Sequence, residues 1–530
     1  MYSFFKNNIF SISLGTSLSK FAGFLRQIFI AALFGVGFAY DAYNYAYIIP
    51  GFFIIIIGGI NGPLHNAVVA VLTPLEEKRA HQILQNISLK TIFLLLIISI
   101  LIFLNAELII NNIGRDLDKE TQSIAAKQLK ILSPCIPLSG FNGLSYGFLN
   151  SKNKFFTSSI SPIIISLVTI VFISIYWFFN LKNQIFNNLF YLELLPLATL
   201  SGTFIQTIIQ IYEIYKIGLI KFRFNLKKNF LEENRIFNLI IPASFSSGLG
   251  QINVYVDMFF TSSFKGGASG LSYGNFLIQA PLGILSNALI LPLLPQFSKL
   301  INKKNNQELN KILISSIEYC LLASFLMTGF FICFNDLLVD LVFRRGAFNA
   351  QSAIIVKEIL IAYALGIPAY LFRDLLIRIY YSIEATSLPF KLSLYGIVLN
   401  FIFDWILIGA PIQNSRNLLP YNLGVVGLVL ASGIVNLIIC IILSIRLKIF
   451  IKPLPHIILL RKTIFIIIAC IFSIIISQNI LNFYNLNFNE FIKFFEIIFG
   501  STIYFSSYFF LTKFLSVNKL EPKLLKKFLK

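Results

Sequence analysis

Long apolar stretches alternate with short polar ones along almost the whole chain. About fourteen of these runs are near the roughly 20 residues that a helix needs to cross a bilayer. They show no period of two, and only helices and closed barrels pair every backbone group in lipid, so each run is predicted to be helical. The predicted spans cover residues 8–36, 40–72, 89–113, 128–150, 155–180, 191–217, 236–264, 270–298, 311–335, 354–382, 388–409, 423–446, 460–480 and 490–514.

The composition and charge agree with this pattern. Of the 530 residues, 57% are hydrophobic and 12% charged, which leaves no room for a soluble domain and indicates an all-α integral membrane protein. The formal charge is +20, but Lys and Arg lie mostly in alternate short loops. The positive-inside rule therefore explains the charge without nucleic acid as a partner. With an even number of spans, both termini are expected in the cytoplasm.

Two spans resemble each other. YAYIIPGFFIIIIGGINGPLHNAVVAVL in the second and NFLIQAPLGILSNALILPLLPQFSKL in the eighth each have an early Pro and Gly and another Pro further on. Because six spans separate them, the copies would be parallel repeats about an axis along the membrane normal, as in two-lobed transporters. Chance resemblance between apolar segments is the alternative.

Three charged residues lie inside or beside the first two spans: Lys20, Arg26 and Asp41. A Lys or Arg at the bilayer centre costs at least ~2.5–3.5 kcal/mol, so such residues usually face a bundle interior or an aqueous cavity. Lys20 and Arg26 are six apart and would line one cavity only if it is wide or if Gly23 lets the helix unwind. Alternatively, Lys20 snorkels to the cytoplasmic surface and Asp41 caps the second helix.

The tenth span carries further charges in YLFRDLLIRIYYS. Asp374 and Arg378 are four apart and close enough to pair, whereas Arg373 has no local partner. One interpretation is a structural ion pair beside a snorkelling arginine. The other is that Arg373 and Arg378 join Arg26 in a cationic cavity for an anion such as phosphate, whose oxygens match the guanidinium fork.

Acidic and amide residues form a second candidate site. Asn400 and Asp404 lie one turn apart in NFIFDWILIG, and Asp257 lies in VYVDMFF. These side chains supply hard oxygen ligands that suit Na⁺, or one carboxylate could carry H⁺. Alternatively, Asp257 and Asp404 each find an Arg or a hydroxyl and have no further role.

Enzyme motifs are missing from the sequence. His65, His81 and His456 lie far apart, and there is no HExxH, GxSxG or P-loop pattern. The five cysteines lack CxxC spacing, so neither a disulfide framework nor a zinc site is indicated. We therefore predict that the protein is not an enzyme and has no cofactor besides a coupling ion.

Six motifs follow one another in a particular order and spacing: SKFAGFLRQIFIAALFGVGFAYDAYNYAYIIPG, GGINGPLHNAVVAVL, PASFSSGLGQINVYVDMFF, ILPLLPQFSKL, VFRRGAFNA and IYYSIEATSLPFKLS. As a set they resemble the MurJ (MviN) lipid II flippases of the MOP exporter superfamily, with wording closest to cyanobacterial members. The resemblance extends to about residue 450. It implies fourteen helices, with two six-helix lobes in a V shape (1–218 and 219–450) and a terminal helix pair with a basic cytoplasmic tail (451–530).

The resemblance also implies transport of lipid II from the cytoplasmic to the outer leaflet by alternating access. Carried over by position, Arg26 and Asp41 match charged family positions and Lys20 stands where the family usually has Arg, so the resemblance implies that these three residues bind the substrate. Two family arginines fall at Ile54 and Asn275 here, which are losses of positive charge. We expect the arginines of the tenth span to replace that charge.

For the C-terminal lobe, the resemblance implies a Na⁺ site. The matching positions are Asp257, Asn400 and Asp404, with a carbonyl from Leu428 and a hydroxyl from Ser432. Binding there would bias the lobes toward one state and couple an ion gradient to return of the empty carrier.

Other functions are also compatible with the sequence. The first is a flippase for another polyprenyl-linked oligosaccharide. The second is a MATE-like multidrug or cation antiporter, which would want an acidic or aromatic cavity and is disfavoured by Arg26, Arg373 and Arg378. The third is a membrane scaffold, for which the buried charges would be dispensable. Expected partners are membrane lipids and cell-wall synthases, and the chain is expected to be a monomer.

Overall fold

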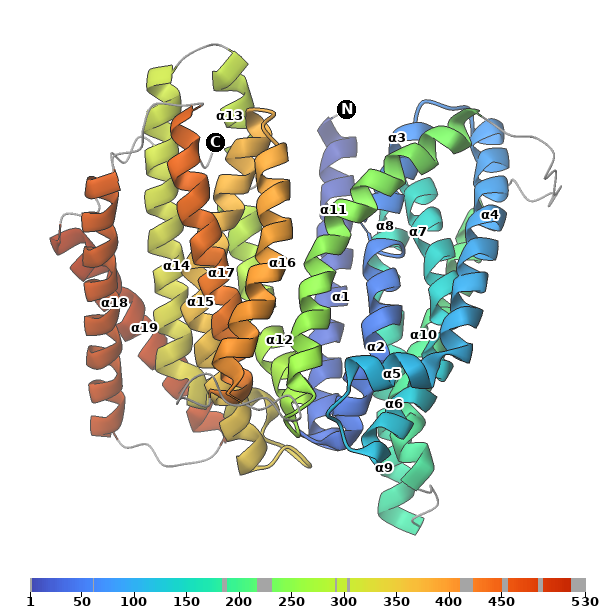
Figure 1. Cartoon of the computed structure of the whole chain (residues 1–530), viewed down its shortest axis with the longest axis horizontal. Coiled ribbons are helices and arrows are strands. Elements are labelled where there is room, and N and C mark those ends of the chain that lie inside the picture. The colour runs from blue at the N-terminus through green and yellow to red at the C-terminus, as the bar shows by residue number, and fades with distance from the viewer. Residues whose placement is uncertain are drawn as a thin grey trace. The chain divides into compact units, whose positions relative to one another are not determined.

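Helices make up all regular structure in the part of the chain that the structure, a computed structural model, describes (Figure 1). That part comprises residues 2–60, 62–183, 188–216, 231–290, 293–302, 306–409, 423–449, 456–484 and 490–515. Its elements are α1 (Tyr2–Phe34), α2 (Phe38–Ile56), α3 (Pro63–Leu72), α4 (Glu77–Leu104), α5 (Ala106–Ile113), α6 (Lys119–Leu132), α7 (Cys135–Ser151), α8 (Phe155–Ile160), α9 (Ile163–Asn183), α10 (Asn188–Lys216), α11 (Leu231–Thr261), α12 (Gly267–Leu285), the π-helix η1 (Ser286–Ile290), α13 (Leu293–Asn302), α14 (Asn306–Phe343), α15 (Ala350–Ser382), α16 (Ser387–Ile408), α17 (Gly424–Arg446), the 3₁₀-helix η2 (Leu447–Ile449), α18 (His456–Tyr484) and α19 (Glu490–Phe514).

Ten described helical segments are long and apolar enough to cross a membrane. The four other predicted spans correspond to α2 with α3, to α7, to α11, and to α12 with η1 and α13. The chain is therefore an all-helical multi-pass membrane protein, which confirms the fold class expected from the apolar runs.

The second span is not one continuous helix. α2 ends at Ile56, and α3 starts at Pro63, which suits a first helical position because its missing amide would have no partner there. The glycines between them allow close packing on α7. A Cβ on Gly143 of α7 would lie 2.0 Å from the Ile57 carbonyl oxygen, and one on Gly58 would lie 2.8 Å from the Cβ of Ser139. The segment between α2 and α3 therefore packs closely against small residues of α7. The hydropathy pattern alone does not reveal this contact.

Contacts group the chain into two compact units. Unit 1 comprises residues 1–269 and 345–348, and unit 2 comprises 270–344 and 349–530. The predicted lobe boundaries, between 218 and 219 and between 450 and 451, lie outside the described residues, as does the basic tail beyond 515. The division into two six-helix lobes and a terminal pair therefore stays a prediction.

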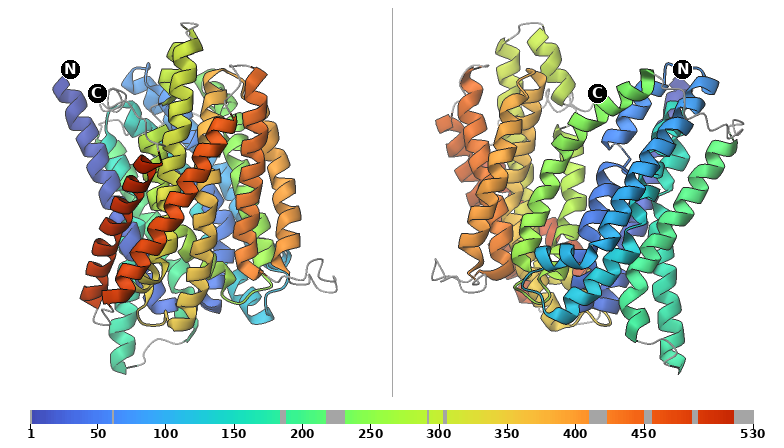
Figure 2. Two further views of the ribbon diagram at one scale, coloured as in Figure 1. Left: turned by 90° about the vertical axis from the view of Figure 1, so that its left-hand side faces the viewer. Right: turned by 45° about the vertical axis from the view of Figure 1, so that its right-hand side comes forward.

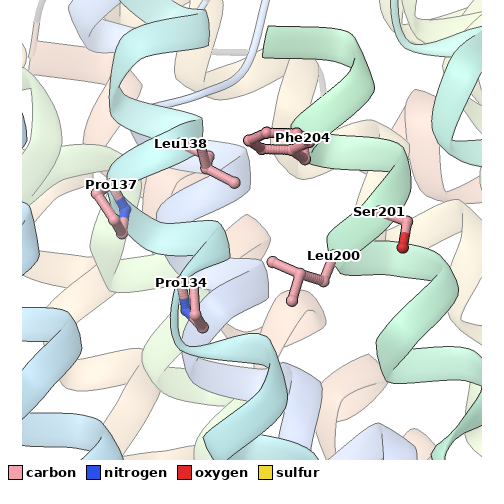
Figure 3. A pocket seen from close by; sticks show the side chains of 6 residues that line it. All are labelled: Pro134, Pro137, Leu138, Leu200, Ser201 and Phe204. Atoms are coloured by element: carbon pink, nitrogen blue, oxygen red, sulfur yellow. The ribbon is translucent and has the colours of Figure 1, made fainter. Parts of the chain in front are cut away.

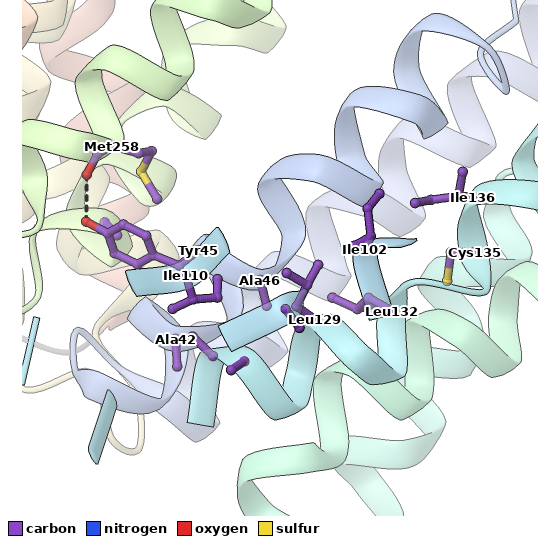
Figure 4. Packing of buried hydrophobic residues seen from close by; sticks show 14 of the residues in the cluster. Ala42, Tyr45, Ala46, Ile102, Ile110, Leu129, Leu132, Cys135, Ile136 and Met258 are labelled. Carbon is purple, nitrogen blue, oxygen red and sulfur yellow. Dashed lines mark hydrogen bonds between the residues drawn. The ribbon is translucent and has the colours of Figure 1, made fainter. Parts of the chain in front are cut away.

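In unit 1, α11 packs against α2 and α3. Buried apolar residues of α2, α4, α5 and α6 form a core that Met258 of α11 joins (Figure 4). The hydroxyl of Tyr45 on α2 donates a hydrogen bond of 2.8 Å to the Met258 carbonyl oxygen. That bond satisfies a phenol with 1% of its surface exposed and fastens α11 to α2.

In unit 2, the terminal helices α18 and α19 pack beside α14 (Figures 1 and 2). The hydroxyls of Tyr504 and Tyr508 on α19 donate to the carbonyl oxygens of Leu326 and Leu322 on α14, at 3.0 and 2.9 Å. Gly329 makes room for this contact, since a Cβ there would lie 2.0 Å from the Tyr504 hydroxyl. The terminal pair is therefore held to unit 2 by hydrogen bonds as well as by apolar packing.

Candidate functional site

Arg26 is a half-buried cation on α1 in unit 1. Its Nε atom is buried and has no hydrogen-bond partner in the described part of the chain. Tyr43 and Tyr47 of α2, in the same unit, stack with ring centroids 5.6 Å apart. Lys20, on the same helix, has an exposed side chain. Arg26 is thus the half-buried member of this pair, and Lys20 is the exposed one.

Asp41 serves as the cap of a helix distant in sequence. Its carboxylate accepts hydrogen bonds from the backbone amides of Gly266 and Ser269, at 2.6 and 2.7 Å, and from the Ser269 hydroxyl at 2.6 Å. These donors lie at the N-terminus of α12, where the orphan amides and the helix dipole favour an anion. The alternative that Asp41 caps its own helix is wrong, because the N-cap position of α2 is Gly37 and no side chain caps this helix. In this structure Asp41 therefore caps the first turn of α12.

Arg373, on α15 of unit 2, is held by residues from its own helix and from α17. Its Nη1 donates to Oδ1 of Asn436, and its guanidinium carbon lies 5.3 Å from the centroid of the Tyr370 ring. Nε of Arg373 is buried without a partner among the described residues. Two neutral groups thus restrain the side chain of Arg373. Among the described residues, no carboxylate forms an ion pair with its positive charge.

Asp374 and Arg378 form the ion pair that their spacing predicts. Nε of Arg378 lies 3.4 Å from Oδ1 of Asp374. The hydroxyl of Ser286, the first residue of η1, donates to Oδ2 of Asp374 at 2.5 Å. The carboxylate therefore balances the charge of Arg378 and links α15 to the π-helix. Sequence reasoning missed Ser286, because nothing in the sequence around this serine indicates that it hydrogen-bonds to a residue 88 positions away.

The two positions where family arginines are missing differ in their surroundings. Ile54 on α2 packs against the apolar core of unit 1. Asn275 on α12 has an exposed side chain in unit 2.

Three of the predicted ion ligands lie together in unit 2. Nδ2 of Asn400 donates to Oδ2 of Asp404 at 2.9 Å, and the hydroxyl of Ser432 donates to Oδ1 of Asn400 at 3.0 Å. Leu428 is buried one turn before Ser432 on α17. Asp257 belongs to α11 in unit 1. Among the described residues there is no group of three His, Cys, Asp or Glu side chains that could hold a metal.

An apolar pocket of about 480 Å³ lies between α7 and α10 in unit 1. In Figure 3, Leu138 of α7 and Phe204 of α10 point into the space between the two helices. The remaining lining comes from Pro134, Pro137, Leu200 and Ser201. Without a charged lining residue, this pocket does not suit a phosphate-bearing headgroup.

Comparisons with known proteins agree with the sequence motifs. A family model described as lipid II flippase MurJ matches residues 30–498. A probable lipid II flippase MurJ of Synechocystis sp. is 35% identical over 80% of this chain and 78% of its own length. The corresponding protein of Rickettsia prowazekii is 26% identical over 73% of this chain and 75% of its own.

Solved structures extend the similarity to the fold. A structure of lipid II flippase MurJ in an inward closed conformation matches with a TM-score of 0.74 and 25% identity over 95% of this chain and 99% of that one. An inward-facing multidrug transporter of the MATE family, also in the MOP superfamily, matches with a TM-score of 0.59 and 14% identity over 83% and 98% of the two chains, which is a likeness of fold alone. The family model covers most of the chain, and this chain therefore belongs to the MurJ family of lipid II flippases.

Proposed function

We propose that this chain moves lipid II from the cytoplasmic to the outer leaflet of a bacterial plasma membrane by alternating access. Membership of the MurJ family carries this proposal. A diphosphate headgroup with its sugars and peptide cannot cross hydrocarbon unaided, because each buried charge without a partner costs several kcal/mol or more. The protein's task is then to shield the headgroup, while the polyprenyl tail stays in lipid. No chemical step is required.

Arg26 and Arg373 are proposed to bind the diphosphate. Both guanidinium groups have a buried Nε without a partner, and neither forms an ion pair with a carboxylate in the described part of the chain. A half-buried cation in this state is stabilised by an anion, and phosphate oxygens match the guanidinium fork. Arg378 and Lys20 would add long-range positive potential, since Arg378 is already paired and Lys20 is exposed. Arg373 would thus replace charge missing at Ile54 and Asn275.

Complementation tests the function and the arginines together. The wild-type chain, Arg26→Ala, Arg373→Ala and a control, Arg446→Ala, are expressed in a bacterium depleted of its own lipid II flippase. Arg446 is an exposed arginine at the end of α17. We expect growth and outer-leaflet precursor with the wild type and the control, and loss of both with the other variants at equal membrane levels.

The outcomes separate the proposals. Full flipping by Arg373→Ala would refute charge replacement by Arg373 and leave the family function intact. Failure of the wild type despite correct insertion would point to a different polyprenyl-linked glycan as substrate. The absence of the family's arginines at Ile54 and Asn275 motivates that alternative.

A Na⁺ site at Asn400, Asp404 and Ser432 is proposed as the coupling device. A carboxylate with 0% exposure, an amide oxygen and a hydroxyl are hard oxygen donors of the kind that Na⁺ prefers. Leu428 and Asp257 are the further ligands that the family resemblance implies. We expect NaCl, compared with KCl at equal ionic strength, to raise the thermal stability of the wild type but not of Asp404→Asn. Asp336→Asn, an exposed carboxylate of α14, is the control. An equal response of Asp404→Asn and wild type would refute the site.

The distribution of basic residues among the loops supports a proposed orientation. We propose that both termini lie in the cytoplasm and that the chain acts as a monomer, with cell-wall synthases among its partners. A fluorescent protein that matures only in the cytoplasm, fused to the C-terminus, should fluoresce. A dark fusion of full-length protein would contradict this orientation.

A further inference from the structure

One face of α10 is polar, although the helix lies within a predicted membrane span. Its polar residues follow one another at helical spacings of three and four and are almost completely buried. They are Thr199, Thr203, Gln206, Thr207 and Gln210. The three threonines donate to carbonyl oxygens four residues earlier, so their hydroxyls are satisfied within α10. The two glutamines must find partners elsewhere.

Gln206 finds its partners on α7. Its Nε2 donates to the Tyr146 hydroxyl at 2.5 Å, and that hydroxyl lies 3.2 Å from the hydroxyl of Ser161 at the end of α8. Nδ2 of Asn142, one turn before Tyr146, is 3.5 Å from Oε1 of Gln206. A chain of neutral polar groups therefore crosses the contact between α7 and α10.

This chain of polar groups is incomplete. Gln210 follows Gln206 by one turn on the same face and has 0% of its surface exposed. Neither its Oε1 nor its Nε2 has a partner among the described residues, and Oδ1 of Asn142 has none either. Exchanging the amide oxygen and nitrogen of Gln210 would not help, because both positions lack a partner. Groups of this kind inside a membrane span must be satisfied by something other than bulk water.

We propose that unit 1 holds ordered water between α7 and α10, bound by Gln210 and Asn142 beside the Tyr146–Gln206 hydrogen bond. Water both donates and accepts, so it can serve the amide oxygens and Nε2 of Gln210 at once. A cation would satisfy the oxygens but not Nε2, and none of these side chains is charged. This inference goes beyond the proposed function and does not rest on it.

Radiolytic hydroxyl-radical footprinting of the full chain in detergent micelles tests the proposal. Radicals form from water in place, so a buried tyrosine is modified rapidly only when a bound water adjoins it. Tyr146 is the reporter, and Tyr45 is the matched control in the same unit. Both are 1–2% exposed and both hydroxyls have protein partners, but only Tyr146 bonds to Gln206, one helical turn from the unpartnered amide of Gln210. We expect Tyr146 to be modified several-fold faster than Tyr45, with ¹⁸O from labelled water in the product.

Variants tie this modification to the proposed ligands. Gln210→Leu and Asn142→Leu should each lower the rate at Tyr146 toward that of Tyr45, while Gln82→Leu, an exposed glutamine of α4, should leave it unchanged. The wild-type comparison does not require any variant to fold. Equal rates at Tyr146 and Tyr45 in the wild type, or a rate at Tyr146 indifferent to Gln210→Leu in folded protein, would overturn the proposal.

Discussion

Asp41 should contribute far more to stability than its place at the start of a helix suggests. Its carboxylate is 3% exposed and accepts three short hydrogen bonds at the N-terminus of α12. Replacing it by Ala removes a helix cap, worth about 0.5–2 kcal/mol, and leaves buried amide donors unsatisfied at about 1–3 kcal/mol each. Because these contributions overlap, we expect a total loss of about 3–5 kcal/mol.

Asp118 provides the comparison for this prediction. It caps α6 through the Thr121 amide at 3.0 Å, but its side chain is exposed. Water can take over the donor when the cap is removed, so Asp118→Ala should cost about 1 kcal/mol. Asp41→Asn should be intermediate, because its amide keeps one acceptor but turns a donor toward the amides of α12.

The assay is equilibrium unfolding of purified protein in mixed detergent and SDS micelles, with helicity as the readout. The expected order of stability is wild type, Asp118→Ala, Asp41→Asn and then Asp41→Ala. A loss for Asp41→Ala no larger than for Asp118→Ala would refute the reasoning, since burial of the unsatisfied donors would then carry no cost.

Two further predictions concern the terminal helix pair. Glu318→Gln should destabilise the contact of α18 with α14 by about 1–3 kcal/mol, because Nζ of Lys462 lies 2.5 Å from the largely buried carboxylate. Faster proteolysis of α18 would show this loss of stability. As a double-mutant control, Glu318→Gln should cause no further change in a protein that already carries Lys462→Gln. Gly329→Ala should cost about 1–3 kcal/mol, because the new methyl group overlaps the Tyr504 hydroxyl. Gly283→Ala, where a Cβ meets nothing within 4 Å, should be neutral or stabilising, and an equal loss of melting temperature in both would contradict the steric argument.

Local pairings were predictable wherever both partners lie on one helix. The ion pair of Asp374 with Arg378 and the hydrogen bond of Asn400 with Asp404 each follow from a spacing of four residues. The partner of Arg373 was not predictable, because Asn436 lies 63 residues away on another helix. Polar residues in apolar runs are the only hint, and they do not say which helix they face.

The break in the second span shows the same limit. The apolar residues on both sides of it add up to one membrane-length run, so the prediction was a single helix in spite of the Gly/Asn/Pro cluster at 58–63. α2 ends at Ile56 because the following glycines adopt non-helical backbone conformations at little cost. The small residues of α7 then allow this segment to pack closely. The eighth span likewise passes through η1 before α13.

The sequence by itself determined that the chain is helical and membrane-embedded, where its spans lie, and to which family its motifs belong. These properties depend on the hydropathy of contiguous segments and on residues in a fixed order. Only the tertiary structure decided that Asp41 caps α12, that Ser286 reaches Asp374, and that Gln210 is buried without a protein partner. The reason is physical: hydrogen bonds and packing between helices depend on which faces meet, and the linear pattern does not encode which helices become neighbours.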